Sequence, residues 1–239
     1  MEAERKRRRG ATALAVAAAF AGLLACGRPA EGQEEKAPGK APARTSAAAP
    51  APGRIVFDLS AIGYDRGDPD APVFVVEFSD FGCPYCRKFA TEIYPSLEKE
   101  FIRTGKVRWK YVPFALGIFP NGDLAALAAE CAAEQGEPAF WKMHDRLYDG
   151  QREWKSTSEP AELFARYARE LGFDQARFRS CLDQDRRSAR LELSNMTASQ
   201  LGIRATPTFF VNGIRVEGAL PLDLFRRVIN DVAAAGITP

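Results

Sequence analysis

The chain has 239 residues, of which 46% are hydrophobic, and its formal net charge is +2. This composition can form a substantial core in one or two domains. Residues 1–25 carry five basic and two acidic side chains, so the rest of the chain has a net charge of −1, and this balance gives no electrostatic argument for binding nucleic acid.

The N-terminus is typical of an export signal. Residues 5–9 are "RKRRR", and residues 11–24 form an apolar run that is shorter than the ~20 residues a membrane span needs. The next segment, "LLACG", resembles a bacterial lipobox, in which the cysteine is lipidated and becomes the new N-terminus. We therefore expect residues 1–25 to be a lipoprotein signal peptide and Cys26 to carry the lipid. An ordinary signal peptide followed by a chance cysteine is the alternative.

Residues 26–53 are rich in Ala, Pro, Gly and charged residues, and they lack aromatic and branched apolar side chains. Such a segment cannot bury enough apolar surface to fold. We expect a disordered tether that holds a folded domain, residues 54–239, away from a membrane surface.

The folded part is expected to begin with strands. Residues 54–60, "RIVFDLS", alternate as in an edge strand, and residues 63–72 are dense in turn residues. Residues 73–79, "VFVVEFS", form a nearly continuous apolar run, as in a strand that is covered on both faces. A helix is predicted from about residue 84 to 103, with a kink at Pro95, and a second core strand at residues 106–114.

Residues 121–201 have the apolar periodicity of helices, separated by Gly, Pro, Ser and Asp. We expect an all-helical block at about 121–192 that interrupts the sheet. Cys131 and Cys181 each lie on the apolar face of a predicted helix. With Cys26 lipidated, four cysteines remain, and an even number in an exported protein favours two disulfides. We predict a structural Cys131–Cys181 disulfide; two buried free thiols are the alternative.

The last part of the chain, "TPTFFVNGIRVEG", is typical of a β-hairpin, because Asn-Gly favours a type I′ turn. An amphipathic helix follows it. Strands joined by crossover helices predict the α/β class, with a mixed central sheet and helices on both faces.

Cys83-Pro84-Tyr85-Cys86 could be a metal clip, a structural disulfide or a redox pair. A structural zinc site needs four ligands, usually as two close pairs, and the remaining cysteines and His144 are isolated. A disulfide across two residues constrains little of the unfolded chain. These arguments favour a redox pair.

The position of the pair supports this interpretation. Cys83 falls where a strand ends and a helix begins, and the free N–H groups and partial positive charge of a helix N-terminus favour a thiolate. Pro84 suits the first helical turn, where its missing N–H costs nothing. We expect an exposed Cys83 and a shielded Cys86, the arrangement that thiol–disulfide exchange needs.

Residues 54–239 resemble the DsbA-like branch of the thioredoxin superfamily. The motifs that carry the resemblance are "VVEFSDFGCPYCRKF", the helical block, and "GIRATPTFFVNG" near the end. The resemblance implies a thioredoxin-like fold and a redox-active Cys83–Cys86 disulfide, with no requirement for an organic cofactor or a metal.

The resemblance also assigns further site residues. It implies that Pro207 is a cis proline facing the redox pair and that Thr206 lines a groove where a substrate segment pairs by strand addition. It places Glu77 behind the cysteines, buried and with a raised pKa, as a group that assists proton movement. The alternatives are a proline that starts an edge strand and an exposed glutamate. Asp80 is expected in the loop, solvated or forming a turn, and His144 is expected to be a surface or packing residue.

The function implied is that of an extracytoplasmic, lipid-anchored, monomeric oxidase that donates disulfides to exported proteins and is reoxidised by a membrane partner. The Pro84-Tyr85 dipeptide lacks the histidine of the DsbA pattern, which leaves the oxidising strength open. One alternative is a reductase or isomerase that a membrane electron donor keeps reduced. The other is a redox-inert lipoprotein that binds peptides or acts as a chaperone.

Overall fold

A computed structural model describes residues 59–183 and 188–238, within the unit that starts at Arg54. The expected signal peptide, the tether and Cys26 lie outside the described residues. The strands are β1 (Tyr64–Arg66), β2 (Val73–Ser79), β3 (Val107–Pro113), β4 (Thr208–Val211) and β5 (Ile214–Glu217). The helices are α1 (Pro84–Lys88), η1 (Phe89–Ile93), α2 (Tyr94–Leu97), η2 (Glu98–Ile102), α3 (Gly122–Ala133), α4 (Glu137–Asp149), α5 (Gln151–Ser156), α6 (Pro160–Glu170), α7 (Gln175–Asp183), α8 (Ala189–Gln200) and α9 (Leu222–Ala234).

The strands form one sheet in the order β1-β3-β2-β4-β5. β2 and β3 are parallel, whereas the other neighbouring pairs are antiparallel. This confirms the predicted mixed sheet of an α/β fold. The turn between β4 and β5 has positive φ at Asn212 (45°) and Gly213 (86°), as a type I′ turn requires.

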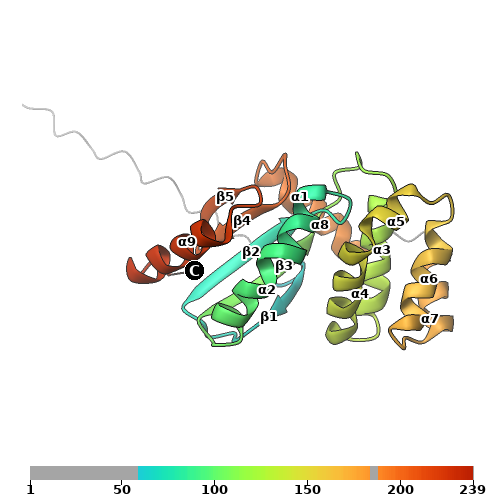
Figure 1. The fold of residues 1–239 in the computed structure, drawn as a ribbon, viewed down its shortest axis with the longest axis horizontal. Helices are drawn as coiled ribbons and strands as arrows, with labels where there is room; N and C mark the ends of the chain where they lie inside the picture. Colours follow the sequence, from blue (N-terminus) through green and yellow to red (C-terminus); the bar gives the residue numbers. More distant parts are fainter. Residues whose placement is uncertain (1–58, 184–187, 239) are drawn as a thin grey trace, which may run out of the picture. The chain divides into compact units, whose positions relative to one another are not determined.

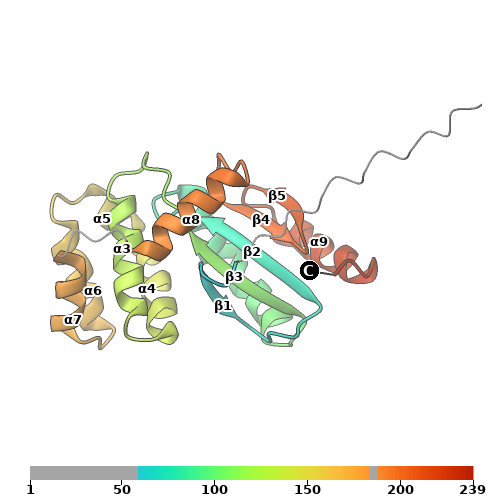
Figure 2. The ribbon, with the colours of Figure 1, turned by 180° about the vertical axis from the view of Figure 1, so that it is seen from behind.

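Helices cover both faces of the sheet (Figures 1 and 2). On one face, α1, α2 and α9 pack over the central strands, and Phe89, Trp109 and Phe225 meet in an aromatic cluster. On the other face α8 crosses the strands, and Ala198 packs in a second core with Val76 and Phe78. Because side chains alternate along a strand, β2 directs Val75, Glu77 and Ser79 to the face that carries α1.

The helices α3 to α7 form a block beside the end of the sheet where α1 begins (Figure 1). Trp154 and Phe164 pack edge to face within it, with their ring centroids 5.9 Å apart. Apolar side chains of the block are buried, among them Phe140 and Leu147. Among the described residues, the structure contains no helix with the length and apolar character of a membrane span.

The predicted helix at residues 84–103 is continuous but uneven. Pro95 has no N–H to donate to the carbonyl of Thr91, four residues earlier. The turn before it widens, and the N–H of Tyr94 bonds to the carbonyl of Phe89, five residues earlier. The predicted kink is therefore accommodated as the π-helical turn η1, and a second π-helical turn, η2, follows after Pro95.

The predicted first edge strand is wrong for its described part. Of residues 54–60, only Leu59 and Ser60 are described, and neither lies in a strand. The edge strand is instead β1, in the segment that was expected to consist of turns. It is fixed by its side chains: the Tyr64 ring stacks on Phe140 with centroids 3.5 Å apart, and Asp65 accepts from Arg108 and Lys110 on β3.

Candidate active site

Cys83 lies at the junction between β2 and α1. It is the N-cap residue of α1, with extended backbone angles (φ −74°, ψ 126°), and Pro84 occupies the first helical position. The backbone N–H groups of Tyr85 and Cys86 interact with its sulfur. β2 ends at Ser79, and Pro84, with its φ already suited to a helix, starts α1 directly after Cys83.

The two cysteines have opposite acidities. The hydrogen bond from the Cys86 thiol is the main influence that lowers the pKa of Cys83, to about 5; burial opposes it, and the Tyr85 and Cys86 N–H groups add to it. Burial raises the pKa of Cys86 well above its ordinary value, and the neighbouring Cys83 raises it further. At neutral pH, Cys83 is therefore a thiolate and Cys86 a thiol.

The expectation of an exposed Cys83 is wrong in degree. The residue is 3% exposed, against 0% for Cys86, because the loops on either side pack close to it. Its neighbour Tyr85 is 65% exposed. The order of accessibility is as predicted, but little of Cys83 reaches the surface.

Thr206 and Pro207 lie opposite the redox pair. Their peptide bond is cis. The Cys83 sulfur lies 3.3 Å from the Thr206 carbonyl oxygen, to which it donates a hydrogen bond in its protonated thiol form. The Thr206 hydroxyl is buried, has no other partner among the described residues, and favours the Cys83 thiolate. Residues more than a hundred positions apart thus meet at one sulfur atom.

Glu77 is buried, with 3% of its surface exposed. Its Oε2 accepts a hydrogen bond of 3.0 Å from Nε1 of Trp109 on β3. Burial raises the pKa of Glu77 to about 7, and the hydrogen bonds from Ser79 and Trp109 work against that rise. The carboxyl group can therefore hold or release a proton at neutral pH.

Ser79 is a site residue that the sequence reasoning missed. It lies two residues after Glu77, so the alternation of β2 places both on the same face. Its hydroxyl hydrogen-bonds to Glu77 and to Cys86, and it accepts from the Tyr148 hydroxyl at 3.3 Å. A hydroxyl has one proton to donate, so Ser79 can serve Glu77 or Cys86 alternately. The signal that could have found it was its spacing from Glu77.

The expectation of a solvated Asp80 is wrong, although the expectation of a turn former is correct. The carboxylate is buried because it ties two loops together, accepting from the N–H of Gly82 at 2.7 Å and of Leu116 at 2.8 Å. Burial raises its pKa to about 6, against these two hydrogen bonds.

His144 is a packing residue. It is buried on α4, and its ring packs edge to face against Tyr111 with centroids 4.5 Å apart. Its Nδ1 lies 2.8 Å from Oδ1 of Asp145, and burial lowers the pKa of the ring. Within the described ranges, no three His, Cys, Asp or Glu side chains gather as a metal site would need.

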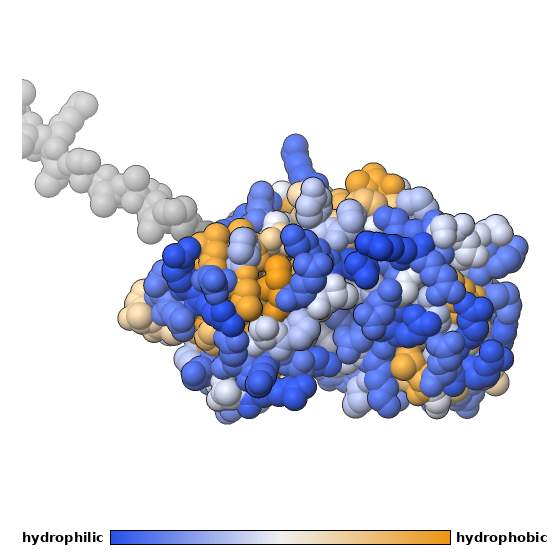
Figure 3. Space-filling model, viewed as in Figure 1, coloured by the Kyte–Doolittle hydropathy of each residue, from blue (hydrophilic) through white to orange (hydrophobic). Residues whose placement is uncertain are grey.

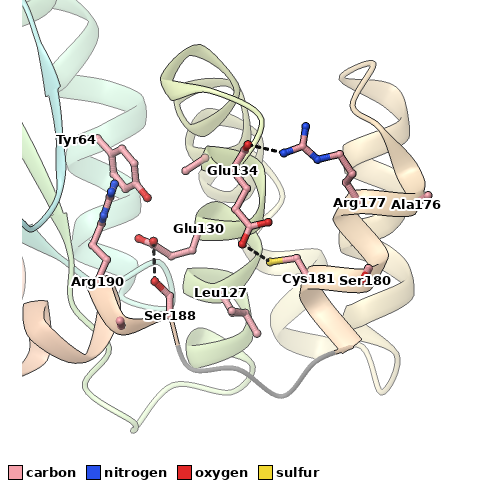
Figure 4. A pocket seen from close by; sticks show the side chains of 12 residues that line it. Tyr64, Leu127, Glu130, Glu134, Ala176, Arg177, Ser180, Cys181, Ser188 and Arg190 are labelled. Atoms are coloured by element: carbon pink, nitrogen blue, oxygen red, sulfur yellow. Dashed lines mark hydrogen bonds between the residues drawn. The ribbon is translucent and has the colours of Figure 1, made fainter.

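Cys131 and Cys181 form a disulfide between α3 and α7, with 5.6 Å between their Cα atoms. Cys131 is buried, whereas Cys181 lies at a cavity of about 840 Å³ between α3, α7 and the start of α8 (Figure 4). Oε1 of Glu134 lies 3.6 Å from the Cys181 sulfur. A disulfide sulfur has no proton to donate, so this contact places a carboxylate against the bond.

Comparison with known proteins agrees with this site. A family model described as Thioredoxin matches residues 63–231. Probable disulfide bond formation protein D of Bacillus anthracis is 33% identical over 151 residues, which are 62% of this chain and 68% of that protein. The crystal structure of oxidised BdbD from Bacillus subtilis has a TM-score of 0.67 and 27% identity, and covers 74% of this chain and 95% of its own.

A second kind of relative is much longer than the matched segment. Na(+)/H(+) antiporter NhaA 3 of Salinispora tropica is 39% identical over 177 residues, which are 73% of this chain but 25% of that protein. The chain thus spans about a quarter of the length of the antiporters that it matches. From the fold, the redox pair and the family match together, the chain belongs to the thioredoxin superfamily, in its DsbA-like branch of thiol:disulfide oxidoreductases.

Proposed function

We propose that the chain is an extracytoplasmic oxidase that donates the Cys83–Cys86 disulfide to exported proteins. The observation that carries the proposal is the contrast between the two cysteines: a pKa of about 5 for Cys83 beside a buried Cys86 whose pKa is raised. A stable Cys83 thiolate favours the reduced form of the pair, so the disulfide is a good electron acceptor.

The reaction has two exchange steps. A substrate thiolate attacks the Cys83 sulfur of the oxidised pair; the Cys83–Cys86 bond breaks, a mixed disulfide forms on Cys83, and Cys86 leaves as a thiolate. A second substrate thiolate attacks the substrate sulfur of the mixed disulfide, and Cys83 leaves as a thiolate. Two electrons pass from the substrate to the pair, which a membrane partner must then reoxidise.

Glu77 and Ser79 supply the proton that Cys86 needs when it leaves. Glu77 is protonated in part at neutral pH, because its pKa is about 7. Ser79 contacts both groups, so it can pass a proton to Cys86 and recover one from Glu77. Thr206, with Pro207, lines the place where the substrate segment pairs beside Cys83.

The surface near the pair suits unfolded substrates. Tyr85 is 65% exposed and Ile118, in the loop between β3 and α3, is 71% exposed. Apolar side chains also gather between α9 and α2 on the face that Figure 3 shows. Exposed apolar surface of this kind supports contact with proteins that have not yet buried their own cores.

Oxidative refolding tests the proposal. The oxidised full-length chain is incubated with reduced, unfolded ribonuclease A, and the recovery of ribonuclease activity is followed. We expect stoichiometric transfer of disulfides that a Cys83→Ser variant cannot perform. Recovery that Cys83→Ser supports equally would favour a redox-inert chaperone. Reduction of an already oxidised substrate, without any transfer of disulfides to a reduced one, would favour a reductase.

The location is proposed from the N-terminal sequence. A lipidated Cys26 anchors the domain to a bacterial membrane, and residues 27–53 tether it. We expect Cys26→Ser to move the protein from the membrane fraction to the soluble extracytoplasmic fraction, which fractionation and immunoblotting measure. Unchanged membrane association of the variant would contradict the lipid anchor.

A further inference from the structure

Three consecutive carbonyl groups beside the redox pair accept hydrogen bonds from one short helix. Nε2 of Gln151 donates to the carbonyl oxygens of Phe81, at 2.6 Å, and Cys83, at 2.8 Å. Nζ of Lys155 donates to the carbonyl oxygen of Gly82, which lies between them, at 2.6 Å. Both donors belong to α5, in the helical block rather than in the sheet domain.

The helix α5 is well placed to hold these groups. Gln151 and Lys155 are four residues apart, so they share one helix face. Gln151 is buried. Between them, Trp154 is buried and anchors α5 through its indole N–H, which donates to the Leu147 carbonyl at 2.7 Å. The two side chains therefore project from a fixed support.

The opposite side of the same loop is held by Asp80. Its carboxylate accepts the N–H of Gly82, and its own carbonyl accepts the N–H of Cys83 at 3.0 Å. Gly82 has no room for a side chain, because a Cβ there would collide with Phe119. The loop before α1 is thus fixed through its N–H groups by Asp80 and through its carbonyl groups by α5.

We propose that Gln151 and Lys155 are positioning residues that hold the loop of residues 81–83 so that the Cys83 sulfur stays over the first turn of α1, and that they thereby set the redox reactivity of the pair. The inference rests on the proposed function, and it gives the helical block a part in the chemistry. The N–H groups of Tyr85 and Cys86 and the Thr206 side chain stabilise the Cys83 thiolate by hydrogen bonds. If the loop is released from α5, the sulfur is held less firmly in the position where it accepts these hydrogen bonds. The Lys155 ammonium also brings a positive charge to the loop that carries the thiolate.

Four variants of the full-length chain test the inference. Gln151→Leu and Lys155→Met remove the donors while keeping side chains of similar size. Lys155→Arg keeps the charge and the donors. Arg152→Met is the matched control, because Arg152 is exposed on the same helix and its side chain makes no recorded hydrogen bond within the described residues.

Two quantities are measured for each variant. One is the pH midpoint of Cys83 alkylation in the reduced protein. The other is the equilibrium constant for reduction of the Cys83–Cys86 disulfide by glutathione, with thiols assigned by peptide mass spectrometry to exclude the other three cysteines. We expect Gln151→Leu and Lys155→Met to raise the midpoint and to lower the constant by about threefold or more. Lys155→Arg is expected to stay near the wild type, and Arg152→Met to match it.

Folded variants with wild-type midpoint and constant would overturn the inference, and so would an equal shift in Arg152→Met. If thermal unfolding shows that Gln151→Leu does not fold, the inference is decided by comparing Lys155→Met with Lys155→Arg alone. A wild-type chain that oxidises no reduced substrate would refute the proposed function. In that case the alkylation midpoints still test whether α5 positions Cys83.

Discussion

The pair Cys83 and Cys86 shows how position alone separates two identical side chains. Cys83 is the N-cap residue of α1 and its sulfur accepts hydrogen bonds, while Cys86 lies one turn further along and is fully buried. The first effect favours the thiolate and the second favours the thiol. The order of the two residues therefore decides which of them meets the substrate.

Alkylation of the reduced protein measures this difference. We expect Cys83 to react with iodoacetamide with a pH midpoint near 5, whereas Cys86 stays unreactive at neutral pH. Because the pKa of Cys83 is lowered from 9.0, its thiolate stabilises the reduced protein fully above pH 9, and this stability is lost as the pH falls through about 5.

A Cys86→Ala variant sharpens the test. The Cys86 thiol is the largest influence that lowers the pKa of Cys83, so its removal is expected to raise the midpoint. If Cys83 of the wild type is alkylated with a pH midpoint near the ordinary pKa of cysteine, the lowered pKa of Cys83 is contradicted.

The pKa of Glu77 is shifted in the opposite direction to that of Cys83, and its effect on stability depends on pH in the opposite way. Its pKa is raised from 4.5 to about 7, so the folded protein holds this proton more tightly than the unfolded one. The resulting stability is fully present below pH 4.5 and is lost as the pH rises through 7. We expect Glu77→Gln, which removes the charge, to raise the free energy of unfolding by roughly 3 kcal/mol at pH 8 and to leave it almost unchanged at pH 4.

Urea unfolding of the reduced proteins at the two pH values gives the measurement. Glu77→Asp, which keeps a titrating carboxyl group, serves as the control. An equal effect of Glu77→Gln at both pH values would mean that the side chain acts by packing rather than by its charge.

At the scale of elements, the apolar periodicity of the sequence predicted the long, regular strands and helices. The strand at residues 73–79 agrees with β2, because a run in which all residues but Glu77 and Ser79 are apolar has few alternatives. The edge strand failed, because Tyr64–Arg66 is only three residues long and is defined by partners on β3 and α4 rather than by its own pattern. Short edges carry little local signal.

The residues of the site likewise fall into those that the sequence could predict and those that it could not. Cys83, Cys86 and Glu77 are close in sequence, and Thr206-Pro207 belongs to a recognisable motif, so all could be predicted. Gln151 reaches the same loop from 68 residues beyond Cys83. No spacing rule brings a glutamine in a short helix to a particular carbonyl group, so only the folded chain reveals it.

The disulfide between α3 and α7 belongs to this scale too. Cys131 and Cys181 are 50 residues apart, and a loop of that length corresponds to about 4 kcal/mol of lost chain entropy in the unfolded state. We expect a Cys131→Ser, Cys181→Ser double variant to lose up to that amount of stability in urea unfolding while retaining disulfide exchange at Cys83–Cys86. Loss of exchange in a folded double variant would contradict a purely structural role.

At the scale of the whole molecule, the mixed sheet and the segments beside it bring residues that are distant in sequence together around the redox pair. β2 contributes Glu77 and Ser79, α1 contributes its N-terminus, and the segment before β4 contributes Thr206. The fold could be expected from the order of elements together with two motifs. The direction in which electrons flow between the redox pair and its substrates could not be predicted in this way, because it depends on the balance of hydrogen bonds around Cys83.

The equilibrium reduction potential of Cys83–Cys86 in glutathione buffers, with thiols assigned by mass spectrometry, tests the central claim most directly. We expect a value nearer to about −120 mV, as in a strong disulfide donor, than to about −270 mV, as in thioredoxin. A value near −270 mV, at the thioredoxin end of that range, would mean that the disulfide is too stable to be passed on. It would contradict the oxidase and favour a reductase built on the same fold.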